Sequence, residues 1–480
     1  MERNAAQIRE RLKHPVIDGD GHWMEPFPVF LEHLAEVGGT AMVDRIRTVW
    51  HNNEAWYRAT PAQRQHQRLR RTIWWGVTTQ TYDKATALLP ALLYERLPEL
   101  GIDFALIYPS YGLAINAIAD NELHLAAMRA YNIMTAQMFA PYLDRFAPVA
   151  IVPTRTPQQA IAELDFVTST LGYKAIMIRG NQERIIPAAM EGEGIDPKKA
   201  AWYCDTIALD SPYDYDPFWQ RCVDNRVAVT QHAGSPSWVD RASISNFTYN
   251  HVGHFAESNH AFARGVFLGG VAQRFPSLNF GFMEGGVSWA SQMCGDLIEH
   301  WEKRRRVSLQ YPSQTDLAEL KSLIYRYGDQ RLRDHADALM NNLDAFRPER
   351  SIEELSRPEF VVDDFAAAGV QSKADIRAVF ENNFYFGCEA DDRATLWAFD
   401  KRMGARLRPV FSSDFTHFDV ADFRDVIPEA YEMVERGWIT EQDFREFTFT
   451  NAARLHTRNN PAFFKDTVVE STVVNELGLK

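Results

Sequence analysis

Short, continuous apolar runs recur along the chain and alternate with stretches of helical periodicity. Continuous runs, as opposed to alternating apolar and polar residues, are typical of strands buried on both faces of a parallel sheet. Their alternation with helices indicates an α/β fold. Eight runs have this character: one that begins at Val16 and ends in Asp20 and His22, followed by 104–109, 148–153, 174–179, 227–232, 278–284, 384–389 and 409–414.

Helices are predicted between and after these runs, at 27–37, 121–143, from Thr156-Pro157 onwards, 216–224, 250–274 and 288–304. Thr156 suits an N-cap, and Pro157 suits the first helical position. Eight strand–helix units favour a (β/α)8 TIM barrel. The structural alternative is an open doubly wound sheet, but the sequence contains neither a Gly-x-Gly-x-x-Gly after the first run nor a P-loop.

We expect a single barrel domain over residues 1–480, interrupted by insertions at about 40–95, 183–213 and 313–375. The first insertion combines several tryptophans with many arginines. Both residue types are enriched at interfaces, which favours a lid over the barrel mouth or a subunit contact. The alternative is an ordinary solvated helical insertion. The second insertion is predicted to be rich in loops, and the third to be charged and helical.

Composition narrows the range of partners. The chain has 480 residues, 46% of them hydrophobic, and a net charge of −13. Because there is no long basic block, nucleic acid is not an expected partner. No apolar run approaches the ~20 residues of a membrane span, and the N-terminal residues lack a signal-peptide core. The four cysteines are widely spaced and form no Cys-x-x-Cys, which predicts reduced thiols and a cytoplasmic location.

The ends of the predicted strands carry residues that can do chemistry. In a barrel of this kind the active site lies at the carboxyl ends of the strands, so these residues should converge. Asp20, His22, His232 and Asp414 offer two nitrogens and two oxygens, which suits Zn²⁺ best and also Mn²⁺ or Fe²⁺. The complete set of strand-end residues is Asp20, His22, Tyr108, Arg179, His232, Glu284, Glu389 and Asp414.

Each of these residues has a structural explanation when taken alone. His232 fits a hydrogen-bonded loop histidine, and Asp414 fits a helix cap. Arg179 fits a partner for a structural acid, and Glu284 fits a carboxylate at a helix start. Inert strand ends would carry turn residues instead, so the recurrence of acids and imidazoles at successive strand ends favours a metal site.

Several of these stretches resemble a known family. Asp20-Gly21-His22 with Glu25-Pro26 is similar to the Asp-x-His-x-x-Glu-Pro opening of the amidohydrolase-2 group of the amidohydrolase superfamily. That group includes aminocarboxymuconate-semialdehyde decarboxylase and the aromatic-acid decarboxylases. The other similar stretches are Gln-His-Ala-Gly at 231–234, 269–278, Met-Glu-Gly-Gly-Val-Ser-Trp at 283–289, and Ser-Asp-Phe-Thr-His at 413–417 with Asn-Ala-Ala-Arg-Leu at 451–455.

The resemblance implies a single divalent metal held by Asp20, His22, His232 and Asp414. Two features depart from the family pattern. The opening is Asp-x-His, whereas the semialdehyde decarboxylase has His-x-His. The Gly-His near the sixth strand of the decarboxylases is absent, because 281–284 reads Gly-Phe-Met-Glu. Either Glu284 is then the acid or base, or a histidine comes from elsewhere, for which His254 is the candidate, with His251 and His260 as neighbours.

The resulting expectation is a metal-dependent hydrolase. The metal would activate water to attack an amide, ester, lactone or C–C bond of a small organic substrate, aromatic ones included, with Glu284, His254 and Asp414 as catalytic residues. Arg179 and Tyr108 are the candidate substrate-binding residues. The alternatives are a non-oxidative decarboxylase, in which Arg179 holds the acid, and a barrel that binds a ligand without catalysis. A homodimer is the expected assembly.

Overall fold

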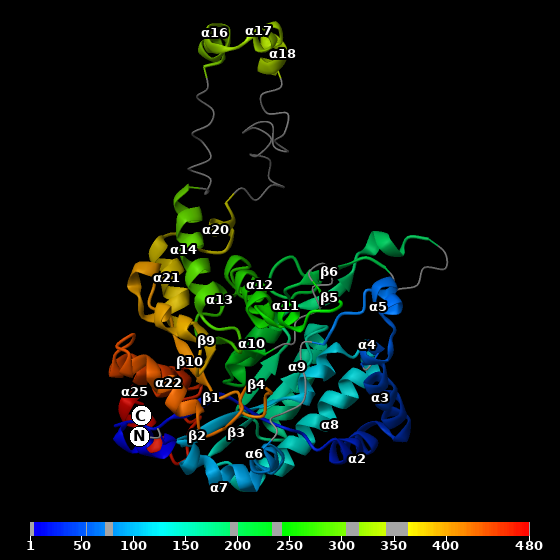
Figure 1. Ribbon diagram of the computed structural model, residues 1–480, viewed down its shortest axis with the longest axis vertical. Coiled ribbons are helices and arrows are strands. Elements are labelled where there is room, and N and C mark those ends of the chain that lie inside the picture. The colour runs from blue at the N-terminus through cyan, green and yellow to red at the C-terminus, as the bar shows by residue number, and fades with distance from the viewer. Residues whose placement is uncertain are drawn as a thin grey trace.

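The computed structural model describes residues 4–53, 55–72, 80–192, 200–232, 242–303, 316–341 and 363–479. Eight parallel strands form one sheet in the order β1-β2-β3-β4-β7-β8-β9-β10, with helices around it (Figure 1). The strands are β1 (Ile17–Trp23), β2 (Phe104–Pro109), β3 (Phe146–Val152), β4 (Ala175–Ile178), β7 (Val229–Gln231), β8 (Phe280–Phe282), β9 (Phe384–Glu389) and β10 (Pro409–Ser412). All eight predicted strands are present, and the (β/α)8 barrel is confirmed.

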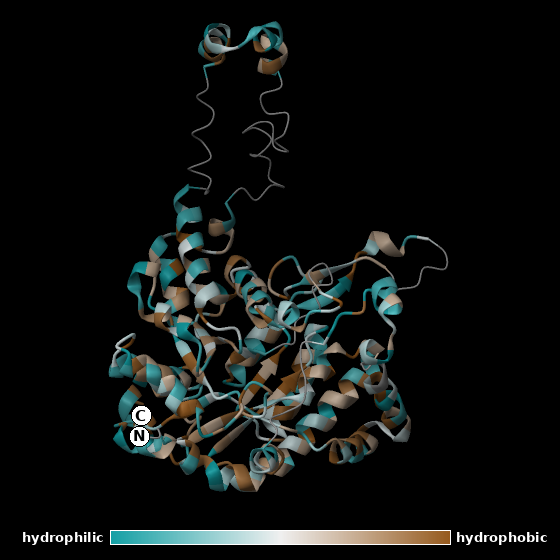
Figure 2. Ribbon diagram, in the orientation of Figure 1, coloured by the Kyte–Doolittle hydropathy of each residue, from teal (hydrophilic) through white to brown (hydrophobic). Residues whose placement is uncertain are grey.

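Burial explains why the strands read as continuous apolar runs. Every residue of β1, β2, β3 and β10 is buried, and the central strands carry the brown, hydrophobic end of the colour scale in Figure 2. Phe280, Phe282, Phe384 and Phe386 pack against one another beneath the helices outside β8 and β9. A parallel sheet covered on both faces needs apolar side chains in both directions, so no alternation remains in the sequence.

The first and last strands meet through side-chain hydrogen bonds. Ser413 donates from its backbone N–H to Asp18 Oδ1 at 3.0 Å, and its hydroxyl donates to Asp18 Oδ2 at 2.5 Å. The Ser412 hydroxyl donates to the Asp20 carbonyl oxygen at 3.1 Å. The pairing of β1 with β2 shifts register between Asp18 and Gly21, as a β-bulge does. These contacts bring the ends of β1 and β10 together.

The helices that cover the barrel follow the predicted ranges closely. Thr156 caps α9 by accepting a hydrogen bond from Gln159 N at 3.2 Å, as predicted. These helices, with those of the C-terminal region, are α1 (Ala5–Arg11), α2 (Phe27–Gly38), α8 (Asn121–Phe139), α9 (Pro157–Ser169), α10 (Asp216–Asp224), α14 (Ser288–Lys303), α22 (Val426–Glu435), α23 (Glu441–Arg445), α24 (Asn451–Thr457) and α25 (Glu470–Leu477).

The long helix predicted over 250–274 is three helices. They are α11 (Phe247–His251), α12 (His254–Leu268) and α13 (Val271–Arg274). Gly253 and Gly270 separate them with φ of +78° and +71°. Glycine adopts this left-handed conformation without steric cost, so each break is placed where the chain can turn.

The insertions differ in kind. The described parts of 40–95 are mainly helical, as one interpretation predicted: α3 (Thr40–Asn53), α4 (Ala55–Arg58), α5 (Pro61–Gln67), α6 (Thr81–Leu88) and α7 (Pro90–Leu100). The second insertion, which was predicted to be rich in loops, contains an antiparallel ribbon of β5 (Gln182–Ile185) and β6 (Trp202–Asp205). The third contains α16 (Leu317–Tyr327), α17 (Gln330–Asp334), α18 (Ala336–Asn341), α20 (Asp364–Ala367) and α21 (Lys373–Asn382). In Figure 1, α16, α17 and α18 stand apart from the barrel.

The first insertion is tied to the segment that follows β7. Trp56 Nε1 donates to the Ile244 carbonyl oxygen at 2.8 Å, and Arg71 N donates to the Ser243 carbonyl oxygen at 3.1 Å. The Arg64 guanidinium lies 3.8 Å from the centroid of the Trp56 ring. The Trp and Arg side chains therefore fasten the insertion beside the 243–257 region, on the side of the barrel that β7 leads to.

Two further expectations concern cysteines and membranes. Cys204, Cys222, Cys294 and Cys388 are all free thiols. Among the described residues, no helix combines the length and the apolar character that crossing a membrane would need.

Glu25 fixes the loop after β2 against the end of β1. Its carboxylate accepts hydrogen bonds from the backbone N–H groups of Ser110, Tyr111 and Gly112, at 3.0, 2.8 and 3.1 Å. These donors begin the 3₁₀ helix η1 (Tyr111–Ala117) and would otherwise lack an acceptor. The Glu-Pro motif is thus a structural anchor for the barrel mouth.

We predict that Glu25→Ala lowers the free energy of unfolding by roughly 2–4 kcal/mol, because it leaves buried N–H groups without an acceptor. Glu25→Gln keeps one acceptor oxygen and should lose less. Urea unfolding of the three proteins measures this. An alanine variant as stable as the wild type would contradict the assigned role.

Candidate functional site

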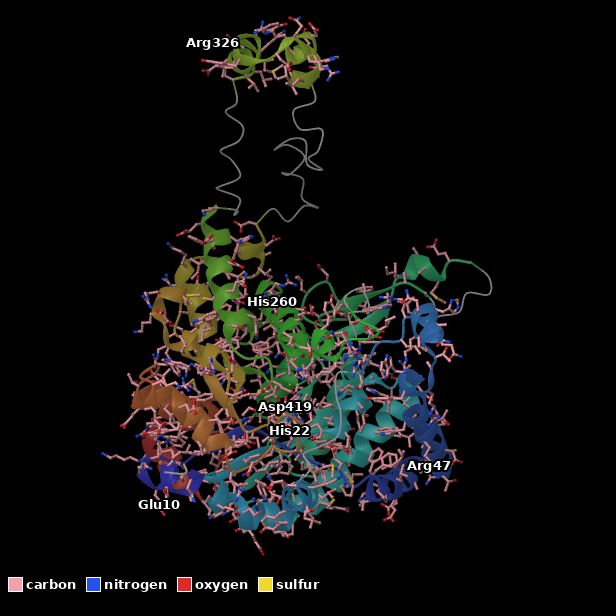
Figure 3. The ribbon with its side chains drawn as sticks, in the orientation of Figure 1. Glu10, His22, Arg47, His260, Arg326 and Asp419 are labelled. Carbon is pink, nitrogen blue, oxygen red and sulfur yellow. The ribbon has the colours of Figure 1, made fainter. Side chains whose placement is uncertain are left out.

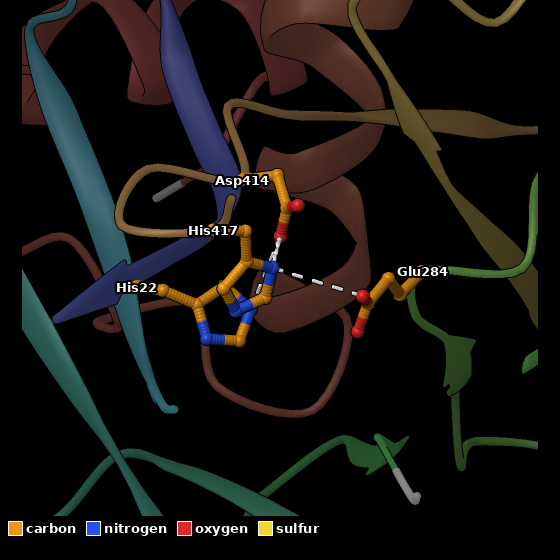
Figure 4. A group of neighbouring side chains, drawn as sticks. All are labelled: His22, Glu284, Asp414 and His417. Carbon is orange, nitrogen blue, oxygen red and sulfur yellow. Dashed lines mark ion pairs between the residues drawn. The ribbon is translucent and has the colours of Figure 1, made fainter. Parts of the chain in front are cut away.

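Six titratable side chains meet at the carboxyl ends of four strands. They come from β1, from the residues directly after β7 and β8, and from the turn after β10. All six are buried, and four of them are drawn in Figure 4. The cluster consists of Asp20, His22, His232, Glu284, Asp414 and His417.

One part of the cluster is built on β1 and β7. His22 Nε2 lies 3.4 Å from Asp20 Oδ1, which confirms that residues two apart on β1 point the same way. His232 Nε2 lies 3.5 Å from the same Asp20 oxygen and 3.1 Å from His22 Nε2. His22 Nδ1 contacts the Pro109 carbonyl oxygen at 2.9 Å, which orients the ring so that Nε2 faces its neighbours.

The other part of the cluster comes from the strand ends of β8 and β10. The Glu284 carboxylate has one oxygen, Oε2, 3.1 Å from His232 Nε2, and the other, Oε1, 3.7 Å from His417 Nδ1. His417 Nδ1 also pairs with Asp414 Oδ1, which lies 3.7 Å from His22 Nε2. Figure 4 shows Glu284 reaching the histidines from the side opposite β1.

The backbone that presents the two acids is in an unusual conformation. Glu284 and Asp414 have φ of +56° and +49°, and Thr416 has φ of +81°. Residues other than glycine rarely occupy this region, and each such residue costs roughly 1–3 kcal/mol unless its surroundings impose it. Because Thr416 and Asp414 both turn this way, the chain folds back after β10, and His417 comes to lie beside Asp414.

The buried acids hold their protons strongly in the metal-free chain. Burial and the neighbouring Asp20 and Glu389 carboxylates raise the pKa of Glu284 well above its usual range. Burial and the Glu284 carboxylate do the same for the pKa of Asp414. Glu389, at the end of β9, has its pKa raised to about 8 by burial and by nearby acids. Like charges crowded in a low-dielectric space cannot all ionise without a compensating cation.

Burial lowers the pKa of two histidines of the cluster, His232 and His417. Burial lowers the pKa of His232 to about 4. Burial and the two neighbouring imidazoles lower the pKa of His417 well below its usual range. Neutral imidazoles are the form that binds metals, so the cluster presents lone pairs rather than positive charge to its centre.

The donor set fits a divalent cation. Both carboxylate oxygens of Asp20 and Oε2 of Glu284 are buried and have no hydrogen-bond partner within the described part of the chain. Buried polar atoms are normally paired, and unpaired ones at a cluster of imidazoles and acids indicate an ion. Among the residues that the structure describes, three sets of mutually close donors occur: His22, Glu284, Asp414 and His417; Asp20, His22 and His232; and Glu389, Asp414 and Asp419.

Tyr108 lies beside the cluster, and both Tyr108 and Arg179 form hydrogen bonds within the protein. The Tyr108 hydroxyl donates to Thr230 Oγ1 at 2.9 Å, and its ring lies 5.3 Å from that of His232. Arg179 Nη1 donates to the Asn116 carbonyl oxygen at 3.1 Å. Arg179 Nη2 lies 3.4 Å from Glu183, while its buried Nε has no partner among the described residues. Tyr108 therefore packs beside the imidazoles, whereas the contacts of Arg179 are with Asn116 and Glu183.

His254 is in a different place from the cluster. It is the first residue of α12 and lines a cavity of about 520 Å³ together with Arg70. Phe255 stands next to both histidine rings, 5.0 Å from that of His254 and 5.8 Å from that of His232. Burial, with Arg70 nearby, lowers the pKa of His254 to about 3. The structure thus places His254 in a cavity that Phe255 separates from His232, and not within the cluster.

His417 is the cluster member to which the sequence assigned no role. It lies within the Ser-Asp-Phe-Thr-His stretch at 413–417, three residues after a proposed ligand. The spacing of three residues between Asp414 and His417 could have indicated that the two side chains pair. Asp419 was also missed, and it lies near Glu389 and Asp414 on the exposed side. Figure 3 labels His22 and Asp419 at the middle of the barrel.

The fold and the cluster together define a class: a (β/α)8 barrel with buried imidazoles and carboxylates at the carboxyl ends of its strands. The family model described as "Amidohydrolase" matches residues 17–456. The chain therefore belongs to the amidohydrolase family, a family of metal-dependent enzymes, which confirms the resemblance seen in its motifs. Among curated proteins, no sequence matches this chain.

Solved structures similar to this chain have the same fold. A dihydroxybenzoic acid decarboxylase from Polaromonas sp. JS666, with bound manganese and the inhibitor 2-nitroresorcinol, is 16% identical, with a TM-score of 0.52 over 94% of this chain and 99% of that one. An amidohydrolase from Mycobacterium avium subsp. paratuberculosis K-10 is 16% identical, with a TM-score of 0.51 over 92% and 99%. A 5-carboxyvanillate decarboxylase from Novosphingobium aromaticivorans DSM 12444, with bound manganese, is 14% identical, with a TM-score of 0.51 over 93% and 97%.

The positive φ of Glu284 gives a test of strain at the site. Glu284→Gly should be more stable than Glu284→Ala by about 1 kcal/mol, because only the alanine keeps a Cβ in the left-handed conformation. In a helix the order is reversed, since glycine is worse there than alanine. Thermal and urea unfolding of the two variants without metal make the comparison. An alanine variant at least as stable as the glycine variant would show that the turn is unstrained.

Proposed function

We propose that the protein is a metal-dependent hydrolase, with a divalent cation bound by Asp20, His22, His232 and Asp414. The observation that supports this is the buried convergence of three carboxylates with three imidazoles, in which both Asp20 oxygens accept no hydrogen bond within the described chain. When bound, the cation would supply Lewis acidity, which acidifies water and polarises a carbonyl.

The residues around the cation have distinct roles. Asp20, His22 and His232 face one point, and Asp414 adjoins them on the His22 side. A nearby cation favours the ionised form of Glu284, so this carboxylate would accept the proton of the attacking water. His417, paired with Asp414, would pass that proton to the leaving group. Phe255 and the neighbouring cavity favour a small organic substrate with an apolar or aromatic part.

The donors suit Zn²⁺, Mn²⁺ and Fe²⁺. We expected Zn²⁺ from two imidazoles and two carboxylates. The third carboxylate, Glu284, adds an oxygen to the set, and oxygen-rich sites suit Mn²⁺. Two proteins of the same fold contain manganese. Reconstitution of the metal-free protein with each ion in turn would identify the one that restores activity.

Non-oxidative decarboxylation of an aromatic acid is the second candidate. His417 favours it, because a histidine reaches the reaction centre from the turn after β10 although none is present at the sixth strand. The Polaromonas and Novosphingobium proteins of this fold are decarboxylases of aromatic acids. Arg179, whose Nε is without a partner in the described chain, would then hold the substrate carboxylate.

The homodimer and the 40–95 lid or subunit contact remain proposals.

Metal content tests the site directly. We predict that the wild type binds a divalent cation and that His232→Ala loses it, because the proposed ligand set then keeps only Asp20, His22 and Asp414. Elemental analysis after dialysis measures the content. His260→Ala, a half-buried histidine against Trp289, is the matched control and should retain the cation. Equal metal content in His232→Ala and the wild type would refute the site.

Glu284→Gln tests the chemistry. The change preserves shape but removes the base, so turnover should fall by roughly 10²-fold or more. Turnover is measured on aromatic esters, lactones and amides for hydrolysis and on hydroxybenzoates for carbon dioxide release. Turnover of the esters, lactones or amides would support the hydrolase. Carbon dioxide release from the hydroxybenzoates would support the decarboxylase. A fully active Glu284→Gln with reduced stability would assign Glu284 to the scaffold, and no reaction with any compound would favour the ligand-binding barrel.

A further inference from the structure

A second cavity, of about 360 Å³, lies next to the residues that follow β1 and contains no member of the metal cluster in its lining. Its volume falls within the range of ~300–1,000 Å³ that is usual for small-molecule sites. Most of its lining is aromatic, and the rings come from four elements, α2, α3, η1 and α8. They are Phe27, Phe30, Trp50, Tyr111 and Tyr131.

The rings are held in place by contacts with one another and with the barrel. The centroid of the Phe27 ring lies 5.1 Å from that of Trp50 and 6.1 Å from that of Phe30. Trp50 belongs to α3, so the 40–95 insertion supplies one wall. On the barrel side, the Tyr131 hydroxyl accepts a hydrogen bond from Trp23 Nε1 at 3.3 Å. The aromatic walls are therefore preformed.

A carboxylate lies among these rings. Glu25 is the charged residue of the lining, and no lysine or arginine is present among the described residues that form it. A Cβ at Gly112 would lie 2.8 Å from Tyr131 Cε2 and 3.1 Å from Glu25 Oε1, so the acid and this ring meet at the glycine. Of the three backbone N–H groups that Glu25 accepts, two bind Oε1 and one binds Oε2. A carboxylate has about four acceptor positions, so Oε2 keeps one.

The negative charge of Glu25 has no cationic partner. Burial raises the pKa of Glu25 to about 6, while its backbone N–H donors act in the opposite direction. At neutral pH the carboxylate is thus mostly ionised, and it forms no ion pair within the ranges that the structure describes. A buried charge without a counter-charge is unfavourable, so a cation bound beside it is stabilised.

We propose that this cavity binds an organic ammonium ion, held among the rings of Phe27, Trp50 and Tyr111 and by the Glu25 carboxylate. The faces of aromatic rings attract cations, most strongly for tryptophan, and rings of this kind recognise methylated ammonium groups. Such a group also has apolar surface that the walls can bury, whereas a small metal cation keeps its water. The inference goes beyond the proposed function and does not depend on the metal cluster.

The charge of the lining separates this cavity from the one beside His254. That cavity of about 520 Å³ includes Arg70, which favours an anion, whereas the cavity at Glu25 has only an acid. The two sites should therefore have opposite preferences for the charge of a ligand.

The test is calorimetric titration of the full-length protein with choline and with 3,3-dimethylbutan-1-ol, its neutral isostere. We expect choline to bind at least tenfold more tightly than the isostere, because only choline carries the charge. Trp50→Leu and Glu25→Gln should each weaken choline binding by at least tenfold. Trp438→Leu is the matched control and should bind choline as the wild type does, because this tryptophan lies elsewhere, against Arg436.

His232→Ala separates this site from the metal centre. It removes a proposed metal ligand and should leave the affinity for choline unchanged. Choline binding that is lost in His232→Ala and kept in Trp50→Leu would place the ligand at the metal centre and overturn the inference.

Two further results would also overturn it: equal affinity for choline and the isostere, or no binding of choline at millimolar concentration. If Glu25→Gln does not fold, the isostere comparison in the wild type and Trp50→Leu still decide. A wild type that binds choline but no divalent metal refutes the proposed function and leaves this inference intact.

Discussion

Repulsion between buried acids is the constraint on which the mouth of this barrel depends. Asp20, Glu284 and Asp414 are almost fully buried within one cluster, and Glu389 adds a fourth carboxylate beside them. Hydrophobic burial in the barrel holds them there, since every strand that carries them is packed on both faces. Burial of apolar side chains in the body of each strand stabilises the fold. It offsets the unfavourable free energy of burying acids at the strand ends, which suit a cation site rather than stabilise the fold.

The same contacts that close the barrel also place the ligands. A side chain at Gly19 would overlap Val410 of β10, and one at Gly21 would overlap the Asp18 carboxylate, so only glycine lets β1 approach β10 this closely. Asp18 then binds Ser413 through both carboxylate oxygens, which fixes the residue directly before Asp414. The acids and glycines of β1 therefore have two effects. They let the first strand meet the last, and they fix the position of Asp414 after β10.

Much of the fold was predictable because it depends on local pattern. Continuous apolar runs identified all eight strands, and Thr156 with Pro157 identified the start of α9. The ribbon of β5 and β6 was missed because Gln182–Ile185 is short and polar and carries no apolar run. His417 was missed for a different reason. Its place beside Glu284 depends on positive φ at Asp414 and Thr416, and nothing in the residue types at those positions announces such a turn.

The donors of the cluster and the lining of the adjacent cavity come from different parts of the chain. This difference explains why the sequence identifies the family but not the substrate. Every donor of the cluster comes from a strand end or from the turn that follows one, and these are the positions that the family motifs cover.

The adjacent cavity is lined in part by residues from outside the barrel strands. It is lined by Arg70 from the 40–95 insertion and by residues of α11 and α12, and Phe255 is the link between it and His232. Arg70 brings positive charge to this wall, and its pKa is lowered by burial there. A partly buried guanidinium in this wall would favour an anionic group on a ligand bound in the cavity. The wall of this cavity thus includes a residue from a segment outside the barrel pattern, whereas the donors of the cluster come from the barrel itself.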